Sequence, residues 1–141
     1  MDEQEFNKYM NNAMIFQGKM NLMANSIDLL LGFILENIKL KPPKMLGTKI
    51  SEFKGNMAIL SLRYSGDFSE LVQDLRKFNE HWITTKHGMV VGGQEINDLT
   101  FHKDGKFHIF NKKTQNEIDS EFTQTMQNIT EIHNSLINNP I

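Results

Sequence analysis

The sequence predicts an all-α fold, namely an up-and-down helical bundle of three long helices and one short helix, with an inserted β-hairpin. Three segments repeat apolar residues at spacings of three and four, which is the pattern of a helix with one buried face. The segment at about 97–111 has the strand-and-turn pattern of a hairpin. The chain has 141 residues, which is enough for one hydrophobic core. We therefore expect a single domain over residues 1–141.

The first long helix is expected from about Glu3 to Leu40. Its buried face is predicted by residues that step by three or four: Met20, Met23, Ile27, Leu30, Ile34 and Ile38. Further apolar residues widen this face and predict that the second half is buried on more than one side: Leu22, Leu29, Phe33 and Leu35. Pro42 and Pro43 end the helix, because the residue before a proline avoids the helical region.

A short helix is expected within Met45–Arg63. Its apolar residues are spaced by four, three and four: Leu46, Ile50, Phe53 and Met57. Thr48 is the expected N-cap of a helix that starts near Lys49. Gly55 is expected to break this helix.

The second long helix is expected from Asp67 to about Thr85. Asp67 can cap it, and Glu70 follows three residues later, as in a capping box. A continuous apolar stripe defines its buried face: Phe68, Leu71, Val72, Leu75, Phe78 and Trp82. The loop that follows is predicted by Gly88, Gly92 and Gly93.

The hairpin has two candidate registers around Asp104 and Gly105. A two-residue loop would pair Phe101 with His108 and put the apolar residues of the two strands on opposite faces. A three-residue loop pairs Phe101 with Phe107, puts Gly105 in the left-handed position, and gives one apolar face: Leu99, Phe101, Phe107 and Ile109. We favour the three-residue loop and expect this apolar face to pack on the bundle. His102 and His108 then lie on the outer face, as solvated residues rather than metal ligands, because a third ligand is not evident.

The last long helix is expected to start between Thr114 and Ser120 and to end near Ile137. Its stripe consists of Ile118, Phe122, Met126, Ile129, Ile132 and Leu136. Four methionines of the first helix offer either core filling or an adaptable binding surface: Met10, Met14, Met20 and Met23.

Composition excludes several classes of function. The chain has no cysteine, so disulfides, thiolate zinc sites and cysteine nucleophiles are ruled out. The formal charge of −2 argues against a general nucleic-acid coat protein. The apolar stretch Ile27–Leu35 is too short to span a membrane, which needs about 20 residues. We expect a cytoplasmic protein that does not bind membranes and needs no cofactor.

The candidate residues for acid–base catalysis and phosphate binding are concentrated at the end of the helix that starts at Asp67. His87 precedes Gly88, and an imidazole at a helix end suits a general acid or base, because its pKa lies near working pH. Lys86 and His81 stand close in sequence and could hold a phosphate. The alternative interpretation is that His87 only complements the helix dipole. Lysines around the two prolines are further candidate phosphate contacts: Lys39, Lys41 and Lys44.

From about Asn21 to Leu136 the chain resembles the HEPN superfamily, the higher eukaryotes and prokaryotes nucleotide-binding domains. Members have a long first helix, then a short segment like Leu46–Ile50. A long helix follows that ends in a pattern of the type Arg-Asn-x-x-x-His-Gly, and then a strand-containing insert and a final helix. Here Phe78-Asn79-Glu80 and His87-Gly88 carry the motif part of the resemblance.

This sequence departs from the motif of the members that cut RNA. Their arginine would fall at Glu80, His81 or Trp82, and none of these is arginine. Trp82 occupies the commonest position. Arg76 lies eleven residues before His87, about 16 Å along a helix, which is too far to replace it. The other arginine of the chain, Arg63, belongs to a different element.

The resemblance implies a homodimer formed along the motif helices, with Trp82 and Phe78 as interface residues. It also implies a metal-independent site in which His87, Lys86, His81 and Asn79 are the candidate catalytic residues. Without the arginine we expect a non-catalytic, degenerate interaction module that binds a protein partner or RNA, in a setting such as bacterial or phage defence or toxin–antitoxin biology. One alternative is a metal-independent ribonuclease that uses His87. Another is a structural subunit that docks through its Met-rich first helix.

Overall fold

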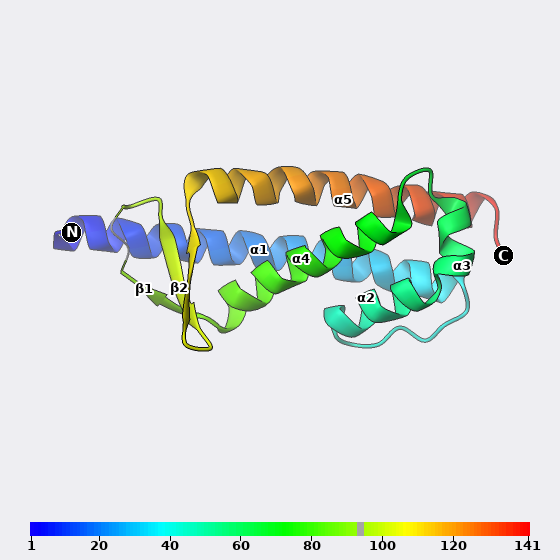
Figure 1. Ribbon diagram of the computed structural model, residues 1–141, viewed down its shortest axis with the longest axis horizontal. Coiled ribbons are helices and arrows are strands. Elements are labelled where there is room, and N and C mark those ends of the chain that lie inside the picture. The colour runs from blue at the N-terminus through cyan, green and yellow to red at the C-terminus, as the bar shows by residue number, and fades with distance from the viewer. Residues whose placement is uncertain (93–94) are drawn as a thin grey trace.

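The computed structural model describes residues 1–92 and 95–141. It is mostly helical and contains one small antiparallel sheet of strand order β1-β2-β3 (Figure 1). The elements in chain order are α1 (Glu3–Asn37), α2 (Leu46–Gly55), α3 (Met57–Leu60), the 3-10 turn η1 (Ser61–Arg63), α4 (Phe68–His87), β1 (Met89–Val91), β2 (Leu99–Lys103), β3 (Lys106–Phe110) and α5 (Lys112–Asn138). Among these described residues, no helix is long and apolar enough to cross a membrane.

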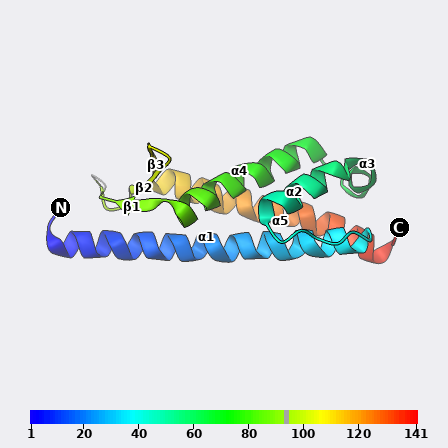
Figure 2. The same ribbon diagram turned by 90° about the horizontal axis from the view of Figure 1, so that it is seen from below.

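Three long helices form the body of the molecule. α1 runs along its whole length, α5 runs beside α1 in the same direction, and α4 returns across them in the opposite direction (Figure 1). α2 packs against α1 and α4 near the end of α1. The sheet lies at the opposite end, beside the first turns of α1 and the end of α4 (Figures 1 and 2).

α1 confirms the predicted buried stripe but not the predicted second buried side. Asp2 caps the helix by accepting a hydrogen bond from the Glu5 amide. Met20, Ile27 and Ile34 are completely buried. Of the four side chains that we expected to widen this face, Leu35 is buried and three are exposed: Leu22, Leu29 and Phe33. The reason is that α2, α4 and the strands all lie on one side of α1 (Figure 2).

The methionines of α1 mostly fill the core, which is the first of the two roles that the sequence offered them. Met20 and Met23 are buried in the core, and Met10 is partly buried against it. Met14 is the exposed member of the four. These methionines therefore act mainly as core filling.

The caps of α2 and α5 differ from the predictions. α2 begins at Leu46, and the Thr48 hydroxyl donates to the Met45 carbonyl instead of capping the helix. α2 ends at Gly55, as expected. α5 begins at Lys112, before the predicted start, because the Asn111 side chain accepts a hydrogen bond from the Thr114 amide.

The hairpin has the register that we rejected. Phe101 pairs with His108, and Asp104 and Gly105 form a two-residue turn with φ of 54° and 74°. Two such left-handed residues form the turn whose twist matches that of the flanking strands, and this backbone preference outweighs the single apolar face of the other register. Phe107 and Ile109 consequently lie on the outer face, 68% and 59% exposed.

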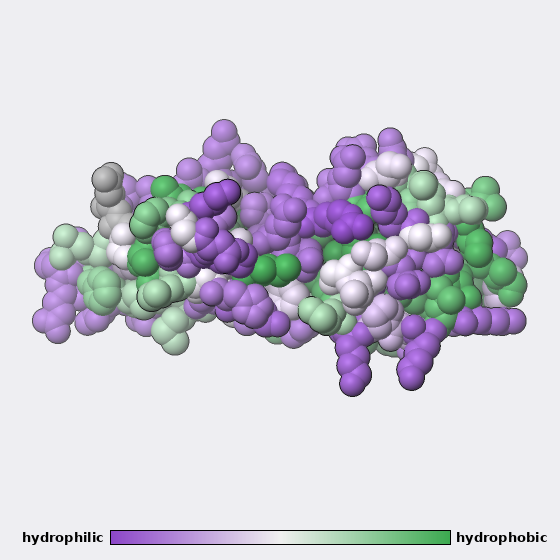
Figure 3. Space-filling view, turned by 60° about the horizontal axis from the view of Figure 1, so that its bottom comes forward, coloured by the Kyte–Doolittle hydropathy of each residue, from purple (hydrophilic) through white to green (hydrophobic). Residues whose placement is uncertain are grey.

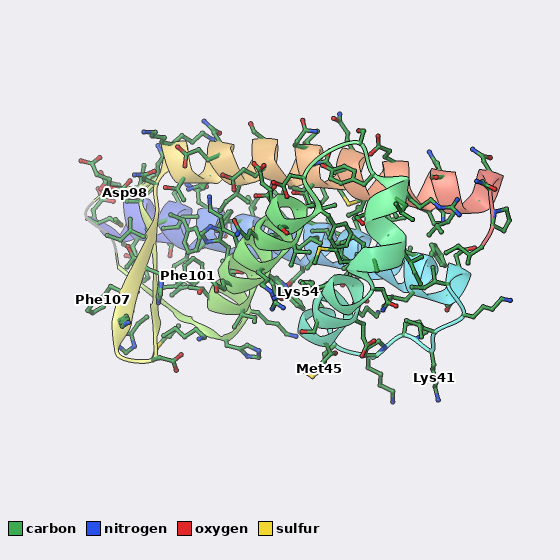
Figure 4. The ribbon with its side chains drawn as sticks, turned by 45° about the vertical axis from the view of Figure 1, so that its right-hand side comes forward. Lys41, Met45, Lys54, Asp98, Phe101 and Phe107 are labelled. Carbon is green, nitrogen blue, oxygen red and sulfur yellow. The ribbon has the colours of Figure 1, made fainter. Side chains whose placement is uncertain are left out.

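The sides of the sheet follow from this register. Phe101 faces α4 and Phe107 lies on the opposite side (Figure 4). His102 and His108 alternate in the same way, so they lie on opposite faces and cannot share a ligand as we had considered. Apolar side chains gather at the sheet end and at the α3 end of the molecule, with a largely polar surface between them (Figure 3).

A third strand, β1, occupies part of the segment that we predicted to be a loop. Val90 pairs with Phe101, so β1 extends the hairpin on its β2 side. The Tyr9 hydroxyl of α1 donates to the Val91 carbonyl at 2.6 Å and accepts from the Thr100 amide at 2.9 Å. This buried phenol ties the sheet to α1. Gly93, the last glycine of the predicted loop, lies outside the described residues.

Candidate functional site

The His87-Gly88 pair lies where α4 gives way to β1. The Gly88 amide donates to the Thr84 carbonyl and closes the helix. A Cβ on residue 88 would lie 2.3 Å from the Thr84 oxygen and 3.1 Å from the Phe101 Cβ. Because only glycine allows these two approaches, the closure of α4 and its packing on the sheet account for Gly88 without reference to any chemistry.

Four of the predicted site residues line one cleft between α1, α2 and α4. The cleft has a volume of about 310 Å³. α4 contributes the predicted residues Asn79, Trp82, Lys86 and His87. Lys44, one of the three lysines predicted near the prolines, lines the same cleft. Sequence reasoning missed the contribution of the other elements: Asn25 and Asp28 from α1, and Met45 and Gly47 from the start of α2.

Two predicted site residues lie elsewhere. His81 is outside the cleft lining and packs edge-on against Phe110, with ring centroids 5.6 Å apart. Burial, followed by the nearby Lys77 charge, lowers the pKa of His81 below its usual value of 6.5. Phe78 is buried in the core against Phe122, so it cannot be the dimer contact that we predicted. Both residues lie on the α5 side of α4. The burial of Phe78 agrees with the predicted apolar stripe of this helix, whereas the packing of His81 against Phe110 was not predicted.

Trp82 is held in place from two directions. Its indole Nε1 donates to the Asn21 side chain of α1 at 2.8 Å. The Lys86 ammonium lies 4.6 Å from the centre of the indole ring, in a cation–π contact. These contacts fix the indole between α1 and α4. Trp82 lines the cleft and lies partly exposed on it.

The start of α2 brings unpaired backbone amides to the cleft. Met45 is its N-cap residue and lies at the open end of the helix (Figure 4). In the part of the chain that the structure describes, no side chain caps this end. The first amides of a helix have no partner within it, and the helix dipole places partial positive charge there. Together with Lys44, this end of α2 favours an anion.

Among the described residues that line the cleft, Asp28 is the one carboxylate, and it is already paired. Asp28 accepts from the Lys49 ammonium at 2.8 Å. The Lys49 side chain is only 11% exposed and lies beside Gly32 of α1, where a Cβ would approach the ammonium to 3.8 Å. This ion pair joins α1 to α2. The negative charge of Asp28 therefore balances Lys49 and not the other lysines that line the cleft, Lys44 and Lys86.

Asn79, which lines the cleft, carries a buried acceptor. Within residues 1–92 and 95–141, its buried Oδ1 has no hydrogen-bond partner. Its Nδ2 lies near Gly47, where a Cβ would come within 3.4 Å. A buried amide oxygen without a partner is costly in a folded protein. It is therefore a group that a bound donor, such as a hydroxyl or a base amino group, would satisfy.

Neither arginine of the chain reaches the cleft. The Arg63 guanidinium donates to the carbonyls of Ser135 and Asn139 and so holds the end of α5. Arg76 lines a different hollow, beside Lys54 and Val72. The cations that line the cleft are thus lysines and, when protonated, His87.

Comparisons with protein-family models, with curated proteins and with solved structures found no match to this chain. The arguments for function therefore rest on the cleft itself and on the resemblance in the sequence.

Proposed function

We propose that this protein is an HEPN-like binding module that holds a segment of single-stranded RNA in the cleft between α1, α2 and α4 and does not cut it. The observation that carries the proposal is the convergence on one cleft of Lys44, Lys86, His87 and the open start of α2. Phosphates favour lysines and helix N-termini, since both present positive charge and N–H donors.

The contents of the cleft favour RNA over a simple anion. Asn79 presents a buried oxygen that has no partner among the described residues, and this oxygen can accept from a ribose hydroxyl or a base amino group. The partly exposed Trp82 ring supplies an apolar surface next to the cations. Protein sites for single-stranded RNA combine backbone charge contacts with aromatic surfaces and hydrogen bonds to base edges.

Cleavage is disfavoured by the group that replaces the arginine. Trp82 carries no charge, and its contacts with Asn21 and Lys86 hold it in place. The Lys86 ammonium is engaged with the indole ring, and a lysine lacks the two-pronged donor geometry that stabilises a phosphate in its transition state. Binding needs only the positive charge, which lysine supplies.

The proposal is tested by the affinity of the purified full chain for a fluorescent single-stranded RNA, measured by anisotropy at several salt concentrations. Lys44→Gln and Lys86→Gln should each weaken binding and reduce the slope of log affinity against log salt by about 0.7 for each lost phosphate contact. Lys113→Gln is the matched control, because Lys113 is exposed on α5 away from the cleft. An equal loss of RNA affinity in all three variants would refute specific binding in the cleft.

A second candidate function, metal-independent RNA cleavage, is favoured by the exposure of His87 beside Lys86 in the same cleft. The test incubates RNA with the protein in EDTA, beside His87→Ala. We expect intact RNA with both proteins. Cleavage by the wild type that disappears in His87→Ala would replace the binding module with a nuclease that works without the arginine.

A further inference from the structure

The outward face of α1 carries an apolar strip that the described part of the bundle leaves uncovered. Ile15, Leu22 and Leu29 follow one another at seven-residue spacing and are 69%, 71% and 59% exposed. Phe33, one turn beyond Leu29, is also exposed. Single exposed aliphatic residues are common on protein surfaces, but three large ones that recur on one face of one helix indicate a contact surface.

The strip points directly away from the bundle, because the residues on either side of it are already engaged. On one side Lys19 pairs with Asp119 of α5 at 2.5 Å. On the other side Asn21 accepts from Trp82, and Asn25 lines the cleft. Figure 2 shows α1 at the edge of the molecule, with α2, α4 and the strands on its inner side.

Charged residues continue the strip by one heptad at each end. Lys8 lies seven residues before Ile15, and Glu36 lies seven residues after Leu29; both are exposed. We call these five residues the seam: Lys8, Ile15, Leu22, Leu29 and Glu36. Leu22 is its centre, and the two ends carry opposite charges.

We propose that the seam binds a second copy of this chain, with the two α1 helices antiparallel about a two-fold axis near Leu22. This arrangement places Lys8 beside Glu36 of the partner subunit, and Ile15 beside Leu29 of the partner subunit. A two-fold interface must complement itself, and the order of charges along the seam does so only when the helices are antiparallel. A parallel pair would set lysine against lysine and glutamate against glutamate.

The helix geometry suits such a pair. The row formed by residues seven apart winds slowly around a straight helix, by about 20° per heptad. Two helices that pack along such rows cross at a shallow angle of about 20°. From Lys8 to Glu36 the seam spans about 42 Å. Gly18 lies between Ile15 and Leu22, with no described atom within 4 Å of the place of its Cβ, and so leaves room for a closely packed partner. The proposal does not depend on RNA binding, because the seam contains none of the cleft residues.

Sedimentation velocity of the full chain over a range of micromolar concentrations tests the dimer. The wild type should sediment as a dimer, and Leu22→Glu should sediment as a monomer with an unchanged circular dichroism spectrum, since the side chain is exposed. Gln127→Glu adds the same charge to the exposed face of α5 and should leave the dimer intact. A monomeric wild type, or a dimer that Leu22→Glu does not weaken, would overturn the proposal.

A charge exchange tests the antiparallel orientation. Lys8→Glu and Glu36→Lys should each raise the dissociation constant by roughly tenfold, because each dimer holds two such pairs. The double variant restores both pairs and should return the dissociation constant to the wild-type value. If the double variant lost as much binding free energy as the two single variants together, the antiparallel arrangement would be excluded.

Discussion

α1 and α5, the two longest helices, lie side by side and bury similar apolar stripes, yet their outward faces are opposite in character. The exposed side chains of α5 are polar or charged up to Ile137 in its last turn. α1 exposes Ile15, Leu22 and Leu29 along its middle. A helix with one apolar side needs one neighbour, whereas a helix with two apolar sides has a second contact to make.

This difference shows that an apolar residue on a helix serves either the core of its own chain or a contact with another molecule. In α5 every stripe residue serves the core of the single chain. In α1 one set of apolar residues serves the core, and another set, on the opposite side, serves the contact that we propose with a second copy. The predictions below test this division, beginning with the largest expected effect.

The first prediction compares the inward faces of the two helices with the outward face of α1. Ile27→Ala and Ile129→Ala remove completely buried side chains and should each lower the free energy of unfolding by about 2–5 kcal/mol. Leu29→Ala, measured in dilute monomer, should change it by less than about 0.5 kcal/mol. Urea titration followed by circular dichroism measures all three. A cost for Leu29→Ala as large as that for Ile27→Ala would show that the outward face belongs to the core of the single chain.

The second prediction compares two ion pairs of α1, one inward and one at the α5 boundary. Asp28→Asn leaves the nearly buried Lys49 ammonium without its counter-ion and should cost about 1–3 kcal/mol. Asp119→Asn removes the exposed pair with Lys19 and should cost no more than about 1 kcal/mol. Chemical denaturation of both variants provides the comparison, and equal costs would contradict the structural role assigned to Lys49.

The third prediction concerns the outward faces alone. If α1 forms the dimer, each tenfold rise in protein concentration should stabilise it by about 1.4 kcal/mol and raise the melting temperature by a few degrees. Leu22→Glu should abolish this dependence, and Gln127→Glu on α5 should retain it. Differential scanning calorimetry at three concentrations suffices. A melting temperature that is constant for the wild type would argue against the dimer.

The prediction with the smallest expected effect tests whether His81 is shielded from solvent where α4 packs against β3. Burial lowers the pKa of His81 in the folded state, so the unfolded chain binds the proton first as the pH falls. The folded state should therefore lose stability as the pH falls below about 6.5 and on through the lower, folded-state pKa. His81→Gln should remove this part of the pH dependence, as measured by urea unfolding at pH 7.5 and pH 5.5. An unchanged dependence would mean that His81 stays accessible to protons.

The sequence by itself determined the helical architecture, because amphipathic stripes and caps are local properties. The stripe of α4 and its Asp67 cap are as predicted, and so is the inward stripe of α1. The presence of the hairpin was also local information, since Asp104 and Gly105 favour a tight turn. His87, Lys86 and Lys44 were identified as candidates from residue type and position, and Asn79 from the resemblance to the HEPN superfamily.

Tertiary structure decided which apolar face has a neighbour and which polar residues meet. The sequence pattern treats Leu29 and Ile27 alike, and only the positions of α2, α4 and α5 leave Leu29 exposed. The hairpin register depended on backbone twist, which outweighed the apolar pattern of Phe107 and Ile109. The cleft joins side chains from α1, α2 and α4 that are far apart in the chain, and such long-range contacts leave no periodic signal.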